Sequence, residues 1–432
     1  MRTPKLEFDV LRRAARRIVR AGVIVVLTAG ALSCAEVGPA TRAPVTERST
    51  VPPVARSPAP VPGPERAPEA ASGASGEVAP GLVQPPAAGM PEGEATAPGQ
   101  ETTIAPGDGI PPPPSSDLIA LILPLDVPEF ARAATAVRDG FLDAAEAAGA
   151  KDQVVVIPHG IDGVISAFET ARERGVRVAV GPLVRDDLKT LALSGASLPW
   201  TLALNQLEDG AALPRAVYTF PLSVDSDARV IAKRAAQDGA RSIDVVEGDS
   251  PLMTRLATAF ARAWVRDGGS APADLPFDAT PDALTGLRST LAKAPPDAVL
   301  LAMNGEHAAL VKPYLGEVRA YASGLIFDRP SLATAHDLDG IRVVEVPWLL
   351  TPDAPAFAAL KPPDVDSDAL IRLYAFGFDA YRIASAFHAE PPGQFDLDGA
   401  TGRISLDGRR FVREGALGVY RDGQLVPLEP AP

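Results

Sequence analysis

Short apolar runs alternate with helix-like stretches from residue 117 to residue 432. The run LIALIL at 118–123 is apolar at every position, which is typical of a strand that is covered on both faces. The stretch 130–148 that follows places its apolar residues on one face of a helix. The same alternation predicts strands at 154–157, 176–180, 200–204, 242–246 and 298–302, and helices at 164–174, 185–194, 253–267, 282–294 and 307–315.

Fully apolar strands separated by helices belong to parallel sheets that helices cover on both faces, so the expected fold class is α/β. A region of about 315 residues is larger than one such hydrophobic core usually supports, and we therefore expect two lobes. The segment YTFPLSVDS at 218–226 interrupts the pattern and suits a crossover between the lobes.

The first 33 residues have a different pattern, in which a basic segment precedes an apolar one. The basic segment ends at Arg20, and the apolar stretch 21–33 is short for a membrane span but right for the core of a signal peptide. It leads directly into Cys34, the only cysteine of the chain. The sequence ALSC at 31–34 resembles a bacterial lipobox, although Leu32 stands one position later than the usual leucine.

We therefore expect a lipoprotein signal peptide at 1–33 and an acylated Cys34, whose several acyl chains would anchor the protein firmly. The alternative is an ordinary secretory signal followed by an incidental cysteine. Ala35, in place of Asp, favours sorting to the outer membrane of a Gram-negative bacterium, with the protein facing the periplasm.

Residues 35–116 are rich in Pro, Ala and Gly, contain 19 of the 45 prolines and show no apolar periodicity. Such a segment buries too little apolar surface to offset its ordering entropy, so we expect a disordered linker, with the acylated cysteine making up a region 34–116. It would span roughly 50 Å as a coil and about 250 Å when extended. A passive spacer and a tether that carries a head away from the membrane are both compatible with it.

Charge and composition exclude several classes of function. The net charge of the chain is −13, and it becomes −18 without residues 1–33, which carry seven basic and two acidic residues. So acidic a surface repels phosphate backbones, which argues against nucleic-acid binding. One cysteine cannot form an internal disulfide, a cysteine-based zinc site or an iron–sulfur site, and we expect no cofactor and no metal.

Catalytic motifs are also absent from the sequence. It has no Gly-x-Ser-x-Gly elbow, no His-Glu-x-x-His and no Walker loop. The four histidines stand in unrelated segments, where we expect them to be solvated or at helix ends: His159, His307, His336 and His388. We therefore expect no enzymatic activity.

The run DVDSD at 364–368 has the alternating acids of a calcium loop, but Ala369 and Ala375 replace the turn glycine and the bidentate glutamate. Ser367 or Asp368 is better interpreted as the N-cap of a helix that continues to about residue 387. Four aromatic residues of that helix are expected to face the core: Tyr374, Phe376, Phe378 and Tyr381. Further on, 396–399 is expected to be a turn that opens a terminal hairpin with strands near 403–406 and 418–421.

Motifs that follow one another through the whole region 117–432 resemble a known family, the penicillin-binding-protein activators, also called LppC or LpoA lipoproteins. Their C-terminal domain has the fold of the type I periplasmic binding proteins. The motifs are IALILPL (119–125), AVRDGF (136–141), VGPL (180–183), ALNQ (203–206), FPLS with DAR (220–223, 227–229), DAVLLA (297–302), IRVVEVPW (341–348), LYAFGFDA (373–380), GATGRISLD (399–407) and YRDGQ (420–424).

The resemblance implies a two-lobed periplasmic-binding-protein-like domain at 117–432. Lobe 1 would comprise about 117–221 and 326–400, lobe 2 about 222–325, and a C-terminal hairpin 401–425. Well-known members also carry an N-terminal helical-repeat domain, and this sequence has the linker in that place.

Proteins of this fold hold a ligand between the lobes, in loops after the carboxyl ends of strands. Those loops contain Asp126 after the first strand, Asn205 and Gln206 after the fourth, and Asn304 and Glu306 after a strand of lobe 2. Asp126 could bind an ammonium group, but its loop LPLDVPEF lacks the Gly and Ser/Thr donors that amino-acid receptors use. Polar residues at strand ends are also what solvent exposure alone would produce.

Two functions follow from these observations, and a third has weaker support. The resemblance implies an outer-membrane lipoprotein that binds a class A penicillin-binding protein, a bifunctional peptidoglycan synthase, and stimulates it without catalysis of its own. The alternative is a tethered receptor for an amino acid or another small ligand. An enzyme that acts on cell-wall polymer is the third.

Overall fold

The computed structural model describes residues 111, 114–208, 211–326, 335–361, 363–365, 367–388 and 390–428, all within one of the two units into which the chain divides, 96–432. The expected signal peptide, Cys34 and nearly all of the expected linker lie outside the described residues. Among the helices of the described part, none has the length and apolar character needed to cross a membrane.

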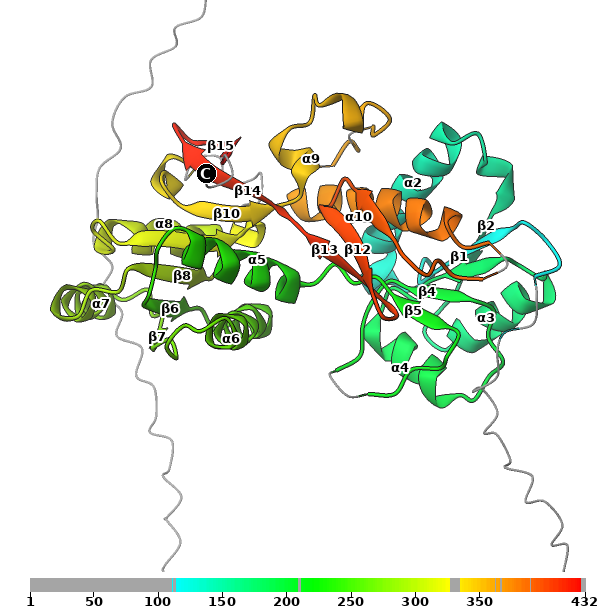
Figure 1. Ribbon diagram of the computed structural model, residues 1–432, viewed down its shortest axis with the longest axis horizontal. Coiled ribbons are helices and arrows are strands. Elements are labelled where there is room, and N and C mark those ends of the chain that lie inside the picture. The colour runs from blue at the N-terminus through cyan, green and yellow to red at the C-terminus, as the bar shows by residue number, and fades with distance from the viewer. Residues whose placement is uncertain are drawn as a thin grey trace, which may run out of the picture. The chain divides into compact units, whose positions relative to one another are not determined.

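Lobe 1 is built on a sheet of eight strands in the order β11-β12-β13-β5-β4-β3-β1-β2 (Figure 1). Five of them are parallel to one another, and β11, β12 and β13 form an antiparallel extension that joins β5. Their bounds are β1 Ile119–Leu123, β2 Val154–Pro158, β3 Val178–Val180, β4 Thr201–Ala203, β5 Val217–Thr219, β11 Asp396–Asp398, β12 Arg403–Asp407 and β13 Arg410–Glu414.

Helices cover both faces of this sheet. Alternate residues of a strand point to opposite sides, and a strand that is apolar at every position therefore needs cover on each side. In β1, Ile119 and Leu121 pack with α2 (Pro128–Ala147) and α10 (Asp368–Ser385). Ala120 and Ile122 pack with α3 (Val164–Glu173) and α4 (Arg185–Leu193) on the other side. The fully apolar run at 118–123 thus belongs to a strand buried on both faces, as predicted.

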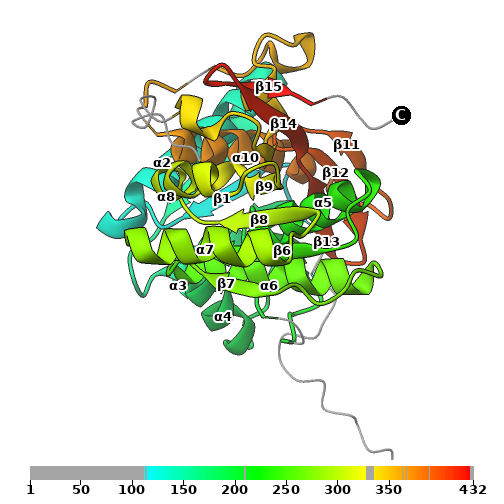
Figure 2. The ribbon, with the colours of Figure 1, turned by 90° about the vertical axis from the view of Figure 1, so that its left-hand side faces the viewer.

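Lobe 2 is built on a sheet of seven strands in the order β15-β14-β10-β9-β8-β6-β7 (Figure 2). Helices α5 (Val224–Gln237) and α6 (Pro251–Arg266) pack on one face, and α7 (Pro281–Lys293) and α8 (Gly305–Val311) on the other. The strands are β6 Ile243–Glu247, β7 Asp274–Pro276, β8 Ala298–Ala302, β9 Arg319–Ser323, β10 Arg342–Glu345, β14 Ala416–Arg421 and β15 Gln424–Pro427. The other helical segments of the described chain are short: α9 Pro347–Leu350 and the 3₁₀ turns Lys151–Gln153, Lys312–Tyr314, Gly324–Ile326, 335–338 and Pro355–Phe357.

The strands and helices predicted between residues 118 and 315 are present, with ends that differ by a few residues. The expected crossover is confirmed, because β5 ends at Thr219 in lobe 1 and α5 begins at Val224 in lobe 2. The helix α5 was not predicted, since its apolar residues are interspersed with Asp225, Asp227 and Arg229. The predicted core positions of α10 are confirmed: Tyr374, Phe376, Phe378 and Tyr381 are all buried.

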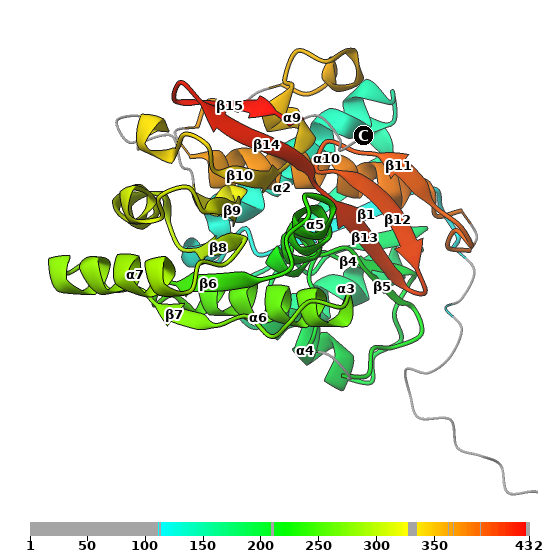
Figure 3. The same cartoon turned by 60° about the vertical axis from the view of Figure 1, so that its left-hand side comes forward.

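The C-terminal region differs from the expectation. Residues 403–407 and 416–421 do not pair with each other: β12 pairs with β13 in lobe 1, whereas β14 pairs with β10 and β15 in lobe 2. The expected turn at 396–399 is instead largely β11. Only Gly415 separates β13 from β14, so this segment passes directly from one sheet to the other (Figure 3).

One lobe boundary expected from the sequence is also wrong, because it assigns a strand of lobe 2 to lobe 1. Strand β10 lies in the range 326–400 that we assigned to lobe 1, yet it pairs in parallel with β9 of lobe 2. Its apolar residues Val343 and Val344 explain this position, because both are buried in the two cores of lobe 2. The chain rejoins the core of lobe 1 with Trp348, Phe357 and Leu360 and continues into α10, and it therefore passes between the lobes three times.

Two glycines allow α2 and α10 to pack with their backbones in contact. A Cβ on Gly140 would lie 1.9 Å from the carbonyl oxygen of Tyr374, and a Cβ on Gly377 would lie 2.0 Å from that of Val137. The two helices contribute several aromatic side chains to the core of lobe 1, including Phe141 and Tyr381, whose rings meet edge to face. Close approach of α2 and α10 is therefore part of how this core closes.

Candidate functional site

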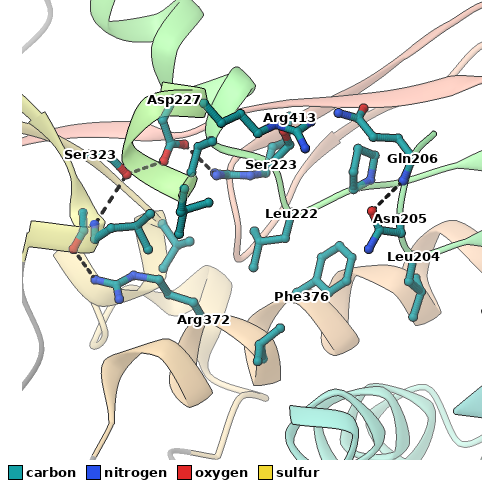
Figure 4. A pocket seen from close by; sticks show the side chains of 18 of the residues that line it. Leu204, Asn205, Gln206, Leu222, Ser223, Asp227, Ser323, Arg372, Phe376 and Arg413 are labelled. Carbon is teal, nitrogen blue, oxygen red and sulfur yellow. Dashed lines mark hydrogen bonds and ion pairs between the residues drawn. The ribbon is translucent and has the colours of Figure 1, made fainter. Parts of the chain in front are cut away.

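A pocket of about 320 Å³ lies between the lobes, at the carboxyl ends of strands from both sheets. Lobe 1 contributes the loops after β3 and β4, the middle of α10 and the end of β13. Lobe 2 contributes the start of α5, part of α6 and the ends of β9 and β10. This is the location at which α/β sheets usually bind ligands, and Figure 4 shows the side chains that line it.

The structure brings two of the five sequence-derived candidates into this pocket, Asn205 and Gln206. Asp126 is exposed in the loop between β1 and α2 and does not line the pocket. Asn304 and Glu306 are exposed at the start of α8, where the Asn304 side chain accepts a hydrogen bond from the His307 N–H at 2.9 Å and so caps the helix. The function of the five residues as a ligand site stays a prediction.

Asn205 joins the loops that follow β3 and β4. Its Nδ2 donates to the carbonyl oxygen of Leu183 at 2.8 Å, and its Oδ1 accepts from the backbone N–H of Gln206 at 2.9 Å. Gln206 then reaches across to lobe 2, where its Nε2 donates to Oδ2 of Asp225 at 2.9 Å. These bonds position the wall of the pocket and occupy the Asn205 amide.

A buried ion pair that sequence reasoning missed closes one end of the pocket. Arg372 of α10 donates from Nε to Glu345 Oε1 at 2.9 Å and from Nη2 to Glu345 Oε2 at 2.5 Å. Nη2 also donates to the carbonyl oxygen of Gly324 at 2.7 Å. Burial acts to lower the pKa of Arg372, but the adjacent Glu345 carboxylate raises it by more. The pKa of this guanidinium therefore lies above its ordinary value.

A second buried pair also joins the lobes. Arg413 of β13 donates from Nη2 to Asp227 Oδ1 at 2.6 Å, and Asp227 Oδ2 accepts from the hydroxyl of Ser323 at 2.7 Å (Figure 4). Burial raises the pKa of Asp227, and the Arg413 guanidinium opposes that rise. Buried charges are stable only when they are paired in this way, and here each pair has one member in each lobe.

The charged groups of the pocket are thus largely engaged with one another, and much of its remaining wall is apolar, with Leu183, Leu204, Leu222 and Phe376. Within the described ranges no cluster of three or more metal-ligating side chains occurs. The arrangement holds two lobes together and offers a small apolar pocket.

Two other sequence-based expectations require comment. His159 is neither solvated nor at a helix end: only 4% of it is exposed, because it follows β2 directly and its backbone bonds to the loop after β1. Its Nδ1 lies 3.0 Å from the carbonyl oxygen of Gly160, and its Nε2 lies 4.0 Å from Asp187.

Ser367 does occupy the N-cap position of α10, but its side chain makes no capping hydrogen bond.

Comparison with known proteins identifies the family to which this fold and pocket belong. The family model described as "LppC putative lipoprotein" matches residues 114–291 and 282–416. The chain belongs to the LppC family. The resemblance inferred from its motifs is therefore confirmed, and so is the two-lobed α/β fold.

Curated relatives of this LppC chain are named penicillin-binding protein activator LpoA. The Enterobacter protein is 29% identical over 301 residues, which cover 59% of this chain and 41% of that protein. The Haemophilus influenzae protein is 25% identical over 326 residues, covering 72% and 55%. The chain spans about half the length of the curated relatives it matches.

Solved structures agree with the fold. The C-domain of Haemophilus influenzae LpoA, described as a regulator of PBP1A, superposes with a TM-score of 0.63 at 23% identity and covers 72% of this chain and 100% of that one. A Chromobacterium violaceum protein described as a candidate branched-chain amino acid ABC transporter has a TM-score of 0.61 at 31% identity, with coverage of 70% and 100%.

Proposed function

We propose that this LppC chain is a periplasm-facing lipoprotein that binds a class A penicillin-binding protein and stimulates its peptidoglycan synthesis without catalysis of its own. The observation that carries the proposal is the family match, which extends over both lobes and includes relatives named as activators. The charged groups of the pocket support it, because a structure-forming set of ion pairs suits a protein that acts through its surface. We further propose that acylated Cys34 anchors the chain in the outer membrane and that residues 35–116 carry the two lobes toward the synthase.

The purified full-length chain should recover a class A penicillin-binding protein from detergent-solubilised membranes of its own source. Added to that synthase with lipid-linked substrate, it should raise the yield of cross-linked product several-fold, because binding to a surface of the synthase would favour its active form. The chain alone should release no fragments from peptidoglycan. Recovery of no class A synthase would contradict the proposal.

The small apolar pocket and the likeness to the Chromobacterium violaceum protein favour a second candidate, a receptor for a small ligand. The same preparation distinguishes the two. A rise in melting temperature with an amino acid, together with failure to recover a synthase, would support the receptor in place of the activator.

Shortening the linker should abolish activation in cells while leaving binding intact in solution. A version without residues 40–110 but with Cys34 retained would lose about 220 Å of extended reach and could not bring the lobes far from the membrane. In solution it should still recover the synthase. A Gly/Ser linker of equal length is the matched control and should restore activity in cells, and activity without any linker would count against the tether.

A further inference from the structure

A second groove, of about 600 Å³, adjoins the inter-lobe pocket and shares Arg185, Gln206 and Arg255 with it. It extends over α4 and the loop after β4 in lobe 1, over α5 and α6 in lobe 2, and over the start of β13. Figure 3 shows α5 beside β13, and α6 packs along α5. We call it the arginine groove, after the six arginines that line it: Arg185, Arg229, Arg255, Arg262, Arg266 and Arg410.

The arginine groove is positively charged on a chain whose net charge is −13. Two acidic residues line it, Glu208 and Asp225, against the six arginines, and Arg266 is also paired with Asp267 at 3.0 Å. Asp225 is engaged by Arg255, which donates from Nε at 3.1 Å and from Nη2 at 2.6 Å. Although burial alone would raise the pKa of Asp225, its bonds to Arg255, Ser223 and Gln206 lower it to about 2, so this carboxylate is ionised at neutral pH.

Arg229 shares the groove with other guanidinium groups. Arg229 is half-buried and donates to the hydroxyl of Ser226 at 3.0 Å. Burial and the nearby cations Arg410 and Arg266 lower the pKa of Arg229, and the Asp225 carboxylate opposes part of that lowering. A protein that holds guanidinium groups together in this way gains stability when anionic groups bind to them.

Gln206 adds a group of a different kind. The residue is 6% exposed, and its Nε2 must face Asp225, because that ionised carboxylate can only accept. The Oε1 atom is therefore left as a buried acceptor without a hydrogen-bond partner among the described residues. An unsatisfied buried acceptor is costly, and a donor supplied by a bound molecule would satisfy it.

We propose that the arginine groove binds an acidic peptide segment of the penicillin-binding protein. Carboxylate side chains would bind the guanidinium groups, which match them in a planar, two-bonded geometry, and a backbone N–H of the segment would donate to Gln206 Oε1. A free phosphate presents its anionic oxygens around one centre, whereas an extended peptide segment can place carboxylates along a groove whose arginines come from α4, α5, α6 and β13. The choice of the synthase as the source of the segment rests on the function proposed above.

A fluorescent peptide of alternating Glu and Ala, with its Gln/Ala counterpart, tests the groove without the synthase. The full-length chain should bind the Glu peptide and not the Gln peptide, and its affinity should fall as salt is added. The triple variant Arg185→Gln, Arg229→Gln, Arg410→Gln should bind at least tenfold more weakly. The matched control changes three exposed arginines elsewhere, Arg172→Gln, Arg288→Gln and Arg421→Gln, and should bind as the unchanged chain does.

Melting temperatures of both triple variants show whether each is folded. If the groove variant is not folded, the single variant Arg262→Gln, on the exposed side of α6, replaces it. Its affinity for the Glu peptide should be about threefold lower than that of the unchanged chain. Equal binding of the Glu peptide by the groove and control variants would overturn the proposal.

Recovery of the synthase separates this proposal from the proposed function. Recovery by the unchanged chain and the control, but not by the groove variant, supports both. Equal recovery by all three overturns the groove as the docking site while the activator function stands. No recovery by any of them overturns the proposed function, and with it the synthase as the source of the segment.

If replacing Glu92, Glu94 and Glu101 by Gln raised the affinity for the Glu peptide, the chain itself would be the occupant, and the proposed partner would be wrong.

Discussion

Replacing Gly140 by alanine should lower the free energy of unfolding by about 3 kcal/mol, and Gly377→Ala should have a similar effect. Each new Cβ would meet a backbone carbonyl of the opposite helix, at 1.9 Å for Gly140 and 2.0 Å for Gly377. Backbone atoms within a helix cannot rotate away as a side chain can, so α2 and α10 would have to separate. Denaturant unfolding followed by circular dichroism measures the change.

The matched control is Gly286→Ala, in the interior of α7, where nothing lies within 4 Å of the added Cβ. Alanine is the better helix former there, so this change should raise stability by about 0.5–1 kcal/mol. Similar effects of Gly140→Ala and Gly286→Ala would show that the helices do not approach as closely as described.

Glu345→Ala should destabilise the protein by about 3–5 kcal/mol, because it leaves the Arg372 guanidinium buried without its carboxylate. Both side chains are less than a tenth exposed, at 8% for Arg372 and 3% for Glu345. The double variant Glu345→Met, Arg372→Leu removes both charges and should recover most of the loss. The measurement is again the free energy of unfolding.

Arg403 and Asp396 provide the control, because they form a pair of similar geometry on the surface, with an N–O distance of 2.5 Å and exposures of 65% and 57%. Asp396→Ala should destabilise the protein far less than Glu345→Ala does, because a solvated ion pair contributes little to stability. If the two alanine variants were equally stable, the inter-lobe pair would contribute no more than a solvated one.

The pattern of apolar residues predicted most of the helices and the central strands, since these are the elements whose periodicity is set by burial. It did not predict which strands pair near the C-terminus. Neither β12 nor β14 names its sheet in its own residues. The strand β13 and Gly415 between them direct the two strands to different sheets, through pairings with residues almost 200 positions earlier, such as Arg410 with Thr219.

The candidate site could be predicted only where its residues stand next to a predicted strand. Asn205 and Gln206 could be placed because they follow a strand, whereas Glu345 and Arg372 come from separate elements whose meeting depends on the fold. A signal was present: Glu345 stands inside the apolar run IRVVEVP, and Arg372 inside an apolar helix. A charge at such a position indicates a buried partner, although it does not identify that partner. The arginine groove gave no local signal, because its members are spread from residue 185 to residue 410.

The three passages of the chain between the lobes bear on how the protein is made. Lobe 1 lacks α10 until residues 368–385 have been synthesised, and lobe 2 lacks β14 and β15 until residue 427. The contact of Gly140 with Tyr374 closes a loop of more than 200 residues, which is slow compared with local folding. Neither lobe can therefore complete its core until residues 410–427 have been synthesised, so both lobes stay open and sensitive to proteases through most of their synthesis.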